Sequence, residues 1–259
     1  MLQKNKIILV IFLIVIGIKI YAQNASDFTF TFTDDFEGVV ITGYIGTAAS
    51  VTIPATIESF PVREIGREAF NEKRITSIII PNGVKYIGNG AFRKCSQLTS
   101  VTIPGSVIKI GSSAFDSCTS LRSVVLHNNI EHIENYAFTK SGLITIELPA
   151  KLTEVKDGVF SECVSLTSVI IPEGVTSIGF LAFNKCTSLS SITLPSTIKT
   201  IGTLAFRDCS DLINVIIPDS VLSIEFSTFL NSFYNCSRLN LASQAALRRR
   251  GWDPNIGNY

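Results

Sequence analysis

Apolar and polar residues alternate along this chain in a pattern that returns every 22 or 23 residues. One unit begins at Leu98, places Val101 and Ile103 on either side of one polar residue, and closes with the pair Ala114-Phe115. A period of this length is typical of stacked-repeat solenoids, in which each unit buries its apolar side against its neighbours. The phenylalanine that closes the unit returns at Phe92, Phe115, Phe138, Phe160, Phe183 and Phe206.

Each unit is predicted to contain a short strand. Two apolar residues around one outward residue have the period of a strand with a single buried face. A proline follows most of these cores and ends the strand ladder, because proline has no N–H to donate. In one unit His127 takes the place of this proline. The strand cores are residues 51–53, 78–80, 101–103, 124–126, 146–148, 169–171, 192–194 and 215–217.

The remainder of each unit is predicted to return along the opposite face. Apolar residues such as Val107 and Ile110 stand three positions apart after the proline. Gly111 suits a tight turn in which a side chain would clash or φ is positive. Ala114 is small where backbones crowd, and Phe115 fills the interior. Burial of each such ring should contribute about 2–3 kcal/mol, and rings of neighbouring units can stack on one another.

The two ends need a different structure because they must cover the first and last hydrophobic layers. Residues 23–47 are predicted to form an N-terminal cap with strands at 28–32 and 39–41. The repeats cover residues 48–241, about eight units, and the first unit carries five additional residues. Residues 242–259 are predicted to form a C-terminal cap with a short helix.

Residues 98–118 have the pattern L-x-x-V-x-I-P-x-x-V-x-x-I-G-x-x-A-F-x-x-C, which resembles the leucine-rich repeat of the Treponema-type, BspA-like class. The resemblance implies a mostly β fold with irregular loops and short helical turns. Its units would form a right-handed, curved solenoid with a parallel sheet on the concave side. The resemblance also implies a surface or secreted location in microbes, often with a role in adhesion to host proteins or other cells.

All six cysteines stand three residues after the repeated phenylalanine, so they are predicted to form one column. An even number in an exported chain often indicates disulfides. A single column of small buried positions instead favours free thiols. Disulfides between adjacent members stay open as an alternative because the distance permits them; zinc spacing of the CxxC kind is absent. The column is Cys95, Cys118, Cys163, Cys186, Cys209 and Cys236.

The N-terminus has the composition of a secretory signal peptide. Lys4 and Lys6 precede an apolar run over residues 7–18, and Ala22 offers a small residue for cleavage. The run is shorter than the roughly 20 residues of a membrane-spanning helix, so an uncleaved anchor is the weaker alternative. Residues 1–22 are therefore predicted to be removed, which leaves no stable membrane span. The mature chain is expected to be secreted, at the cell surface or in the periplasm.

Composition and charge narrow the possible partners. Of 259 residues, 46% are hydrophobic and 17% are charged, and the formal net charge is +1. A nucleic-acid-binding protein would need a basic excess, so no nucleic acid is expected. The only basic run, Arg248 to Arg250, complements the dipole at the end of the predicted helix, although contact with an anionic surface or glycan is an alternative.

Candidate chemistry is sparse. His127 and His132 fall in one unit near two glutamates, but they are interpreted as a solvated loop flank. Asp34, Asp35 and Glu37 lack the ligand spacing of a known calcium loop and are interpreted as a turn. The sequence has no G-x-S-x-G or HExxH motif. We therefore predict no enzymatic activity, no cofactor and no metal site.

The outward residues of the predicted strands are the candidate binding surface. They form two columns, one small and hydroxyl-rich, the other mixing β-branched residues with Thr and Glu. Solenoids commonly bind through such a concave surface, although β-branched residues also simply suit a sheet. The absence of Trp, Tyr and Arg favours a broad contact of modest affinity. The candidates are Ile79, Ser100, Thr102, Ser123, Val125, Thr145, Glu147, Ser168, Ile170, Ser191, Thr193, Asn214 and Ile216.

Taken with the resemblance, these features predict an adhesion-like protein that binds a protein or cell-surface ligand through its concave sheet. The alternative hypothesis is a structural component of the cell envelope whose solenoids pack on one another.

Overall fold

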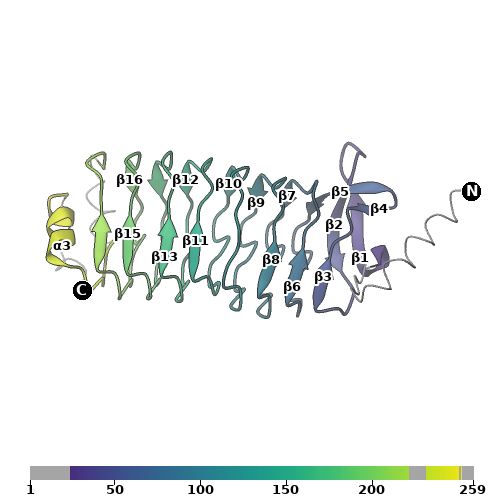
Figure 1. Ribbon diagram of the computed structural model, residues 1–259, viewed down its shortest axis with the longest axis horizontal. Coiled ribbons are helices and arrows are strands. Elements are labelled where there is room, and N and C mark those ends of the chain that lie inside the picture. Colours follow the sequence, from purple (N-terminus) through teal and green to yellow (C-terminus); the bar gives the residue numbers. More distant parts are fainter. Residues whose placement is uncertain (1–23, 222–231, 251, 253–259) are drawn as a thin grey trace, which may run out of the picture.

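The computed structural model describes residues 24–221, 232–250 and 252. It confirms a mostly β solenoid of repeated units, which Figure 1 shows stacked along the long axis. The predicted signal peptide lies outside the described residues, as does most of the chain after the C-terminal helix. None of the helices in the described ranges has the length and hydropathy of a membrane span.

One face carries parallel strands of three residues, each of which buries its middle side chain. Each strand begins one residue before the predicted core, as Ser100 does relative to Val101. Their registers are exact across units: Val51 lies beside Ile78, and Ile78 beside Val101. The strands are β3 (Ser50–Thr52), β6 (Ser77–Ile79), β8 (Ser100–Thr102), β11 (Thr145–Glu147), β13 (Ser168–Ile170), β15 (Ser191–Thr193) and β17 (Asn214–Ile216).

The strand predicted at residues 124–126 is wrong, because this segment has no strand pairing. Val124 and Leu126 are only partly buried, although both pack against the core. This is the unit in which His127 replaces the proline. The sheet is divided here, so that β3-β6-β8 and β11-β13 are separate ladders, and a second division separates β11-β13 from β15-β17.

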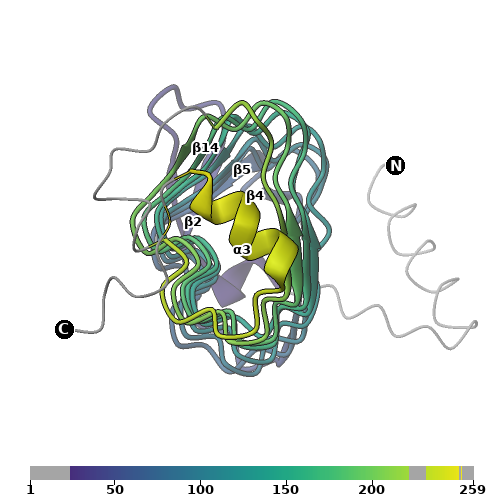
Figure 2. The same ribbon diagram turned by 90° about the vertical axis from the view of Figure 1, so that its left-hand side faces the viewer.

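The chain returns along the other face as predicted, but it forms a second parallel ladder there that the sequence did not predict. Most of its strands have two residues, an outward one followed by a buried one, as in Tyr86 and Ile87. Figure 2, viewed along the stack, shows the two faces on either side of a common interior. The strands are β5 (Phe60–Ile65), β7 (Tyr86–Ile87), β9 (Lys109–Ile110), β10 (His132–Ile133), β12 (Glu154–Val155), β14 (Ser177–Ile178) and β16 (Thr200–Ile201). The second ladder consists of two segments, because β10 and β12 are not paired.

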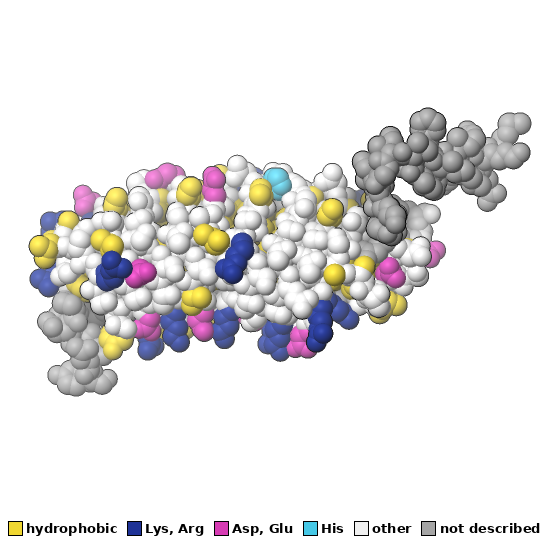
Figure 3. Space-filling view, turned by 60° about the horizontal axis from the view of Figure 1, so that its bottom comes forward, with side chains coloured by type: hydrophobic (Ala, Val, Ile, Leu, Met, Phe, Trp, Pro, Cys, Tyr) yellow, Lys and Arg dark blue, Asp and Glu magenta, His cyan; other side chains and the backbone are white. Residues whose placement is uncertain are grey.

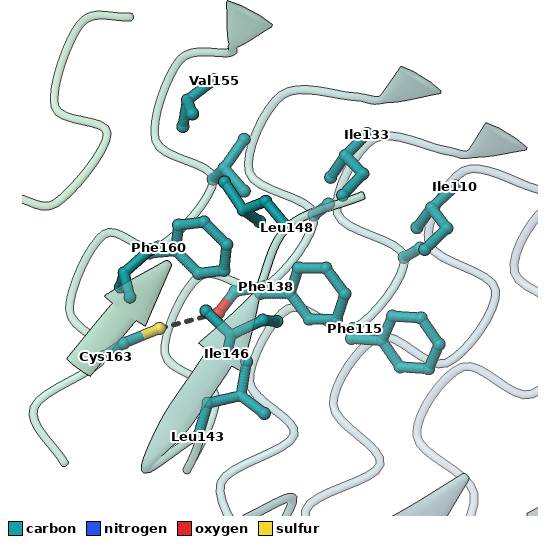
Figure 4. Close-up of a cluster of buried hydrophobic side chains, with 14 of the residues drawn as sticks. Ile110, Phe115, Ile133, Phe138, Leu143, Ile146, Leu148, Val155, Phe160 and Cys163 are labelled. Carbon is teal, nitrogen blue, oxygen red and sulfur yellow. Dashed lines mark hydrogen bonds between the residues drawn. The ribbon is translucent and has the colours of Figure 1, made fainter. Parts of the chain in front are cut away.

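The interior contains a continuous stack of phenylalanine rings, which confirms the predicted ladder. Neighbouring centroids are 4.9–5.8 Å apart with interplanar angles of 3–22°. Phe115, Phe138 and Phe160 lie over one another in Figure 4. The rings are fully buried, so each unit completes the core of the next. The stack comprises Phe70, Phe92, Phe115, Phe138, Phe160, Phe183, Phe206 and Phe233.

The six cysteines are free and buried beside this stack. Each thiol donates a hydrogen bond to the carbonyl oxygen of the phenylalanine in the preceding unit, as Cys163 Sγ does to Phe138 O at 3.0 Å (Figure 4). Burial raises the pKa of the Cys95 and Cys163 thiols to about 12. The column therefore consists of free thiols that donate hydrogen bonds inside the core, and the disulfide alternative is not what the structure contains.

Glycine is required where turns of neighbouring units touch. A Cβ on Gly111 would lie 2.7 Å from the carbonyl carbon of Gly88, and one on Gly202 would lie 2.6 Å from that of Gly179. A side chain at either position would meet backbone atoms that cannot rotate away. Close approach of the units, one of the two reasons considered from the sequence, accounts for these glycines.

The N-terminal end has the strands that the sequence predicted. After the short helix η1 (Ala25–Asp27), β1 (Phe28–Phe32) pairs antiparallel with β2 (Val39–Tyr44), which in turn pairs parallel with β5. The additional residues of the first unit form a hairpin of β4 (Thr56–Ile57) with β5.

The C-terminal end carries α3 (Leu241–Arg248) across the last unit, close to the predicted helix (Figure 2). Asn240 caps the helix by accepting a 2.8 Å hydrogen bond from Ser243 N. Leu247 and Trp252 are buried against the stack. From the basic run, Arg250 reaches Asp219 at 2.9 Å, so this arginine helps to hold the helix in place.

Candidate partner-binding surface

The predicted binding residues do form one surface, which we call the strand face. It consists of the outward residues of β6, β8, β11, β13, β15 and β17, together with Ser123 and Val125 of the irregular unit. In β8, Ser100 and Thr102 are exposed while Val101 between them is 8% exposed. This alternation repeats from strand to strand because the parallel registers are exact. Thus every predicted candidate lies on the strand face.

The first column of the strand face is small and polar. Its members include Ser77 beside Ser100, Thr145 beside Ser168, and Ser191 beside Asn214. At the N-terminal end the hydroxyls bond along the column, since Ser77 Oγ donates to Ser50 Oγ at 2.8 Å. Short side chains leave this column low, so a partner could reach the neighbouring column without obstruction.

The second column alternates apolar and polar residues from one unit to the next. In register, Thr102 lies beside Ile79, Glu147 beside Ile170, and Thr193 beside Ile216. The apolar side chains are 49% (Ile79), 69% (Val125), 58% (Ile170) and 60% (Ile216) exposed. Adjacent parallel strands are about 4.8 Å apart, so successive apolar residues are about 10 Å apart. Figure 3 accordingly shows hydrophobic side chains as separate spots, with charged side chains gathered mainly along the lower edge of the view.

Charge is almost absent from the strand face. Glu147 is its one carboxylate, and no ion pair holds it within the described chain. Neighbouring hydroxyls are used by the fold: Thr99 Oγ1 donates to Thr76 O at 2.9 Å, and Thr167 Oγ1 donates to Ile144 O at 3.0 Å. The surface therefore offers van der Waals contact and hydroxyl hydrogen bonds along a rigid strip, with no arrangement suited to acid–base chemistry.

The histidines do not come together as a site. His132 is exposed on β10, and His127 is exposed in the loop that precedes it. Nearby, Glu134 accepts hydrogen bonds from Lys156 at 2.7 Å and from Lys109 at 3.0 Å. Burial opposes ionisation of Glu134, but these two lysines outweigh it and lower its pKa. In the described ranges no three metal-ligating side chains cluster.

The acidic turn is held by its own hydrogen bonds. Asp35 Oδ1 accepts from Glu37 N at 3.0 Å and from the Thr33 hydroxyl. The bond from Thr33 is the main reason that the pKa of Asp35 is lowered. These contacts support the interpretation of this segment as a turn.

Sequence reasoning missed the outward residues of the second ladder, among them Glu64, Tyr86 and Lys109. Each two-residue strand shows only one outward position, which is too short a pattern to recognise as a strand. The only sign of the returning segment in the sequence was a spacing. After Pro104, for example, the apolar residues Val107 and Ile110 follow at intervals of three.

Comparison with protein families gives one match along the chain. A family model described as "BspA type Leucine rich repeat region" matches six copies, at residues 63–187 and 153–246. No curated protein matches the chain.

Several solved structures are similar. A leucine-rich repeat protein from Bacteroides ovatus has a TM-score of 0.73 and 31% identity, covering 79% of this chain and 55% of that protein. A leucine-rich cell surface protein from Faecalibacterium prausnitzii has a TM-score of 0.69 and 35% identity, covering 74% of this chain and 53% of that one. The leucine-rich repeat protein of T. pallidum has a TM-score of 0.63 and 27% identity, covering 89% and 96%. The chain thus spans about half the length of the first two.

Proposed function

Because the chain belongs to the BspA-type leucine-rich repeat family, we propose that it is an exported, surface-associated protein that binds a protein or cell-surface ligand through the strand face. The family and the similar cell surface protein from Faecalibacterium prausnitzii support export. The apolar run after Lys4 and Lys6 supports the same destination.

The observation that carries the proposal is the exposure of isoleucines that the fold does not need. Val169 and Val215 supply the buried side of their strands, whereas Ile170 and Ile216 next to them are 58% and 60% exposed. Burying one such side chain under a partner would contribute about 1.5–3 kcal/mol at most. Their regular spacing suits a partner that lies along several units.

The chemistry of the strand face also sets the character of the contact. With Glu147 as its only charge, binding should depend weakly on salt, because screening acts on exposed charges. The strand face lacks the aromatic and arginine side chains that dominate high-affinity interfaces. A modest affinity, multiplied by many copies on a cell surface, would be sufficient for adhesion.

The test is binding of the mature chain to immobilised extracellular-matrix and cell-surface proteins. The variant Ile170→Asp with Ile216→Asp should reduce binding about tenfold or more, which corresponds to about 1.4 kcal/mol. A matched control is Val164→Asp with Phe180→Asp, since these side chains are similarly exposed, at 54% and 40%, but lie off the strand face. Equal binding by wild type and the isoleucine variant would show that the partner does not bind at Ile170 and Ile216.

Export is tested separately by fractionating cells and sequencing the N-terminus of the protein. The proposal expects a chain that begins near Gln23 in the exported or surface fraction. A cytoplasmic chain that retains residues 1–22 would contradict it.

A second candidate function is a self-packing component of the cell envelope. The alternation of large and small residues, such as Thr193 beside Ile216, would let a second copy interdigitate with the strand face. Light scattering distinguishes the two, because a strict monomer at high concentration contradicts self-packing and leaves ligand binding intact.

A further inference from the structure

The second ladder carries a groove near the N-terminal end, away from the strand face. Two hollows of about 360 and 440 Å³ lie here, and both are lined by Glu64 and Tyr86. The acidic turn around Asp34 lines one hollow, and Lys109 lines the other. We call the two together the Tyr86 groove. Their volumes fall in the range of small-ligand sites.

The fold creates this groove where the regular stack meets the N-terminal hairpin. Glu64, Tyr86 and Lys109 occupy successive outward positions of β5, β7 and β9, paired in register. Gly88 and Gly111 line the floor of one hollow. Because a Cβ at either glycine would collide with the preceding unit, no side chain can fill that floor.

The two shared residues have polar groups that the described chain leaves unused. Glu64 is half-buried and makes no side-chain hydrogen bond or ion pair within the described ranges, whereas Glu134 on the same face is held by two lysines. Burial raises the pKa of Glu64 with no opposing partner. Tyr86 is 43% exposed, so part of its side chain is open to a ligand.

The lining of the groove is balanced in charge. Four carboxylate and four cationic side chains line the two hollows, and two of the cations also have a carboxylate partner outside the groove, Lys109 with Glu134 and Arg67 with Glu68. Since both signs are present, a strongly charged ligand would leave the groups of one sign unpaired. Carboxylates accept hydrogen bonds, while ammonium and guanidinium groups donate them. A neutral ligand whose groups both donate and accept would satisfy the two sets at once. An exposed aromatic side chain beside them suits contact with the C–H groups on the apolar side of a sugar ring.

We propose that the Tyr86 groove binds a neutral, hydroxyl-rich sugar, with one ring lying on Tyr86 and one hydroxyl donating a hydrogen bond to Glu64. Asn89 and Lys85 stand at the two sides to contact adjacent hydroxyls. The site is independent of the strand face, so one molecule could contact a glycan and a protein at the same time.

The experiment is a titration of the full mature chain with maltohexaose, cellohexaose, mannohexaose and N-acetylated chitohexaose, followed by saturation-transfer NMR and calorimetry. At least one sugar should bind, and Tyr86→Ala and Glu64→Gln should each weaken that binding about tenfold. Phe180→Ala is the matched control, since this ring is 40% exposed but lies outside the groove. Ile170→Asp should also leave sugar binding unchanged, which separates this site from the strand face.

Tyr86→Phe provides a variant that keeps the ring and the fold while it removes the hydroxyl. It should retain most of the sugar binding that Tyr86→Ala loses. The proposal is overturned if no sugar of the panel binds the wild-type chain at about 10 mM. It is equally overturned if Tyr86→Ala and Glu64→Gln bind the sugar like wild type.

Discussion

The two ladders of this solenoid share one interior, but their outward residues differ in chemical character. On the strand face, β8 exposes Ser100 and Thr102, and Glu147 is the only charged outward residue. On the second ladder the outward residues are Tyr86, Lys109 and others that are mostly polar or charged. The inward residues of both ladders are branched apolar side chains in every unit.

This difference shows which positions the stacking controls. An inward side chain must match the one above and below it, because each unit has only its neighbours to pack against. An outward side chain has no such packing constraint, so its chemical type can vary from unit to unit. On the second ladder, pairs such as Lys156 with Glu134 join one unit to another. The outward residues of the strand face form no such ion pair among the described residues, and this is the face that we propose binds a partner.

The largest expected effect is loss of the shared interior. Phe138→Ala would remove a fully buried ring that lies 5.3 Å from Phe115 and 5.8 Å from Phe160. It should lower the free energy of unfolding by about 3–5 kcal/mol and weaken both ladders together. Urea denaturation measures this. Phe36→Ala, at a ring that is 71% exposed, should change stability by less than about 0.5 kcal/mol; equal effects of the two would refute the ladder.

A smaller effect should be specific to the returning face. In Gly202→Ala the new Cβ would lie 2.6 Å from Gly179 C and 2.7 Å from Phe180 N. Overpacking of this kind costs about 1–3 kcal/mol. Gly105→Ala is the control, because its Cβ would meet nothing nearer than His127 at 3.9 Å. Thermal melts of both variants check the prediction, which fails if they coincide.

The cysteine column should make stability fall at alkaline pH. In the folded state burial raises the pKa of Cys163 to about 12, whereas the ordinary value is 9.0. Above pH 9 the unfolded chain therefore binds fewer protons than the folded chain, so the free energy of unfolding decreases as pH rises. Each such thiol contributes a slope of up to about 1.4 kcal/mol per pH unit.

Urea titrations between pH 8 and pH 11 test this slope, and Cys163→Ala should reduce it by one thiol's share. At pH 8 the native protein should not react with a thiol reagent, while the denatured protein should react fully. Rapid labelling of the native chain would contradict the buried column.

The smallest expected effect compares Glu134, which directly follows β10, with Glu147 of the strand face. Glu134→Gln should lower stability by up to about 1 kcal/mol at low salt, because two lysines hold Glu134. Since its pKa is lowered in the folded state, this contribution is present above the ordinary value of 4.5 and lost as pH falls. Glu147→Gln should have no effect on stability. Urea denaturation of both variants at pH 7 and pH 3 measures the difference in the free energy of unfolding. Equal values for the two variants would contradict the stabilising role of the Glu134 ion pairs.

Much of the architecture was predictable because it depends on a pattern that recurs. The ring at Phe115 returns at Phe138 and Phe160, and the recurrence alone indicated a single stacked core. The strand at residues 28–32 was predictable from strict alternation of Phe and Thr. The outward positions of the strand face followed from the same period of two.

Other features depend on how the units meet in space. Residues 124–126 have the pattern of a strand but do not pair, because ladder formation depends on the neighbouring backbone as well as on local alternation. The Tyr86 groove brings Asp34, Glu64 and Lys109 together from different units. Glu64 and Lys109 stand two repeat periods apart, but no sequence pattern places Asp34 of the acidic turn beside them.

The amino-acid sequence by itself therefore determined the repeat, the buried columns and the outward side chains of the strand face, since each follows from periodic burial within one unit. Only the tertiary structure decided where strand pairing is interrupted, which carboxylates form ion pairs with lysines and where the Tyr86 groove lies. Those outcomes depend on contacts between units, and the free energies of such contacts depend on the distance and orientation of groups that the sequence keeps apart.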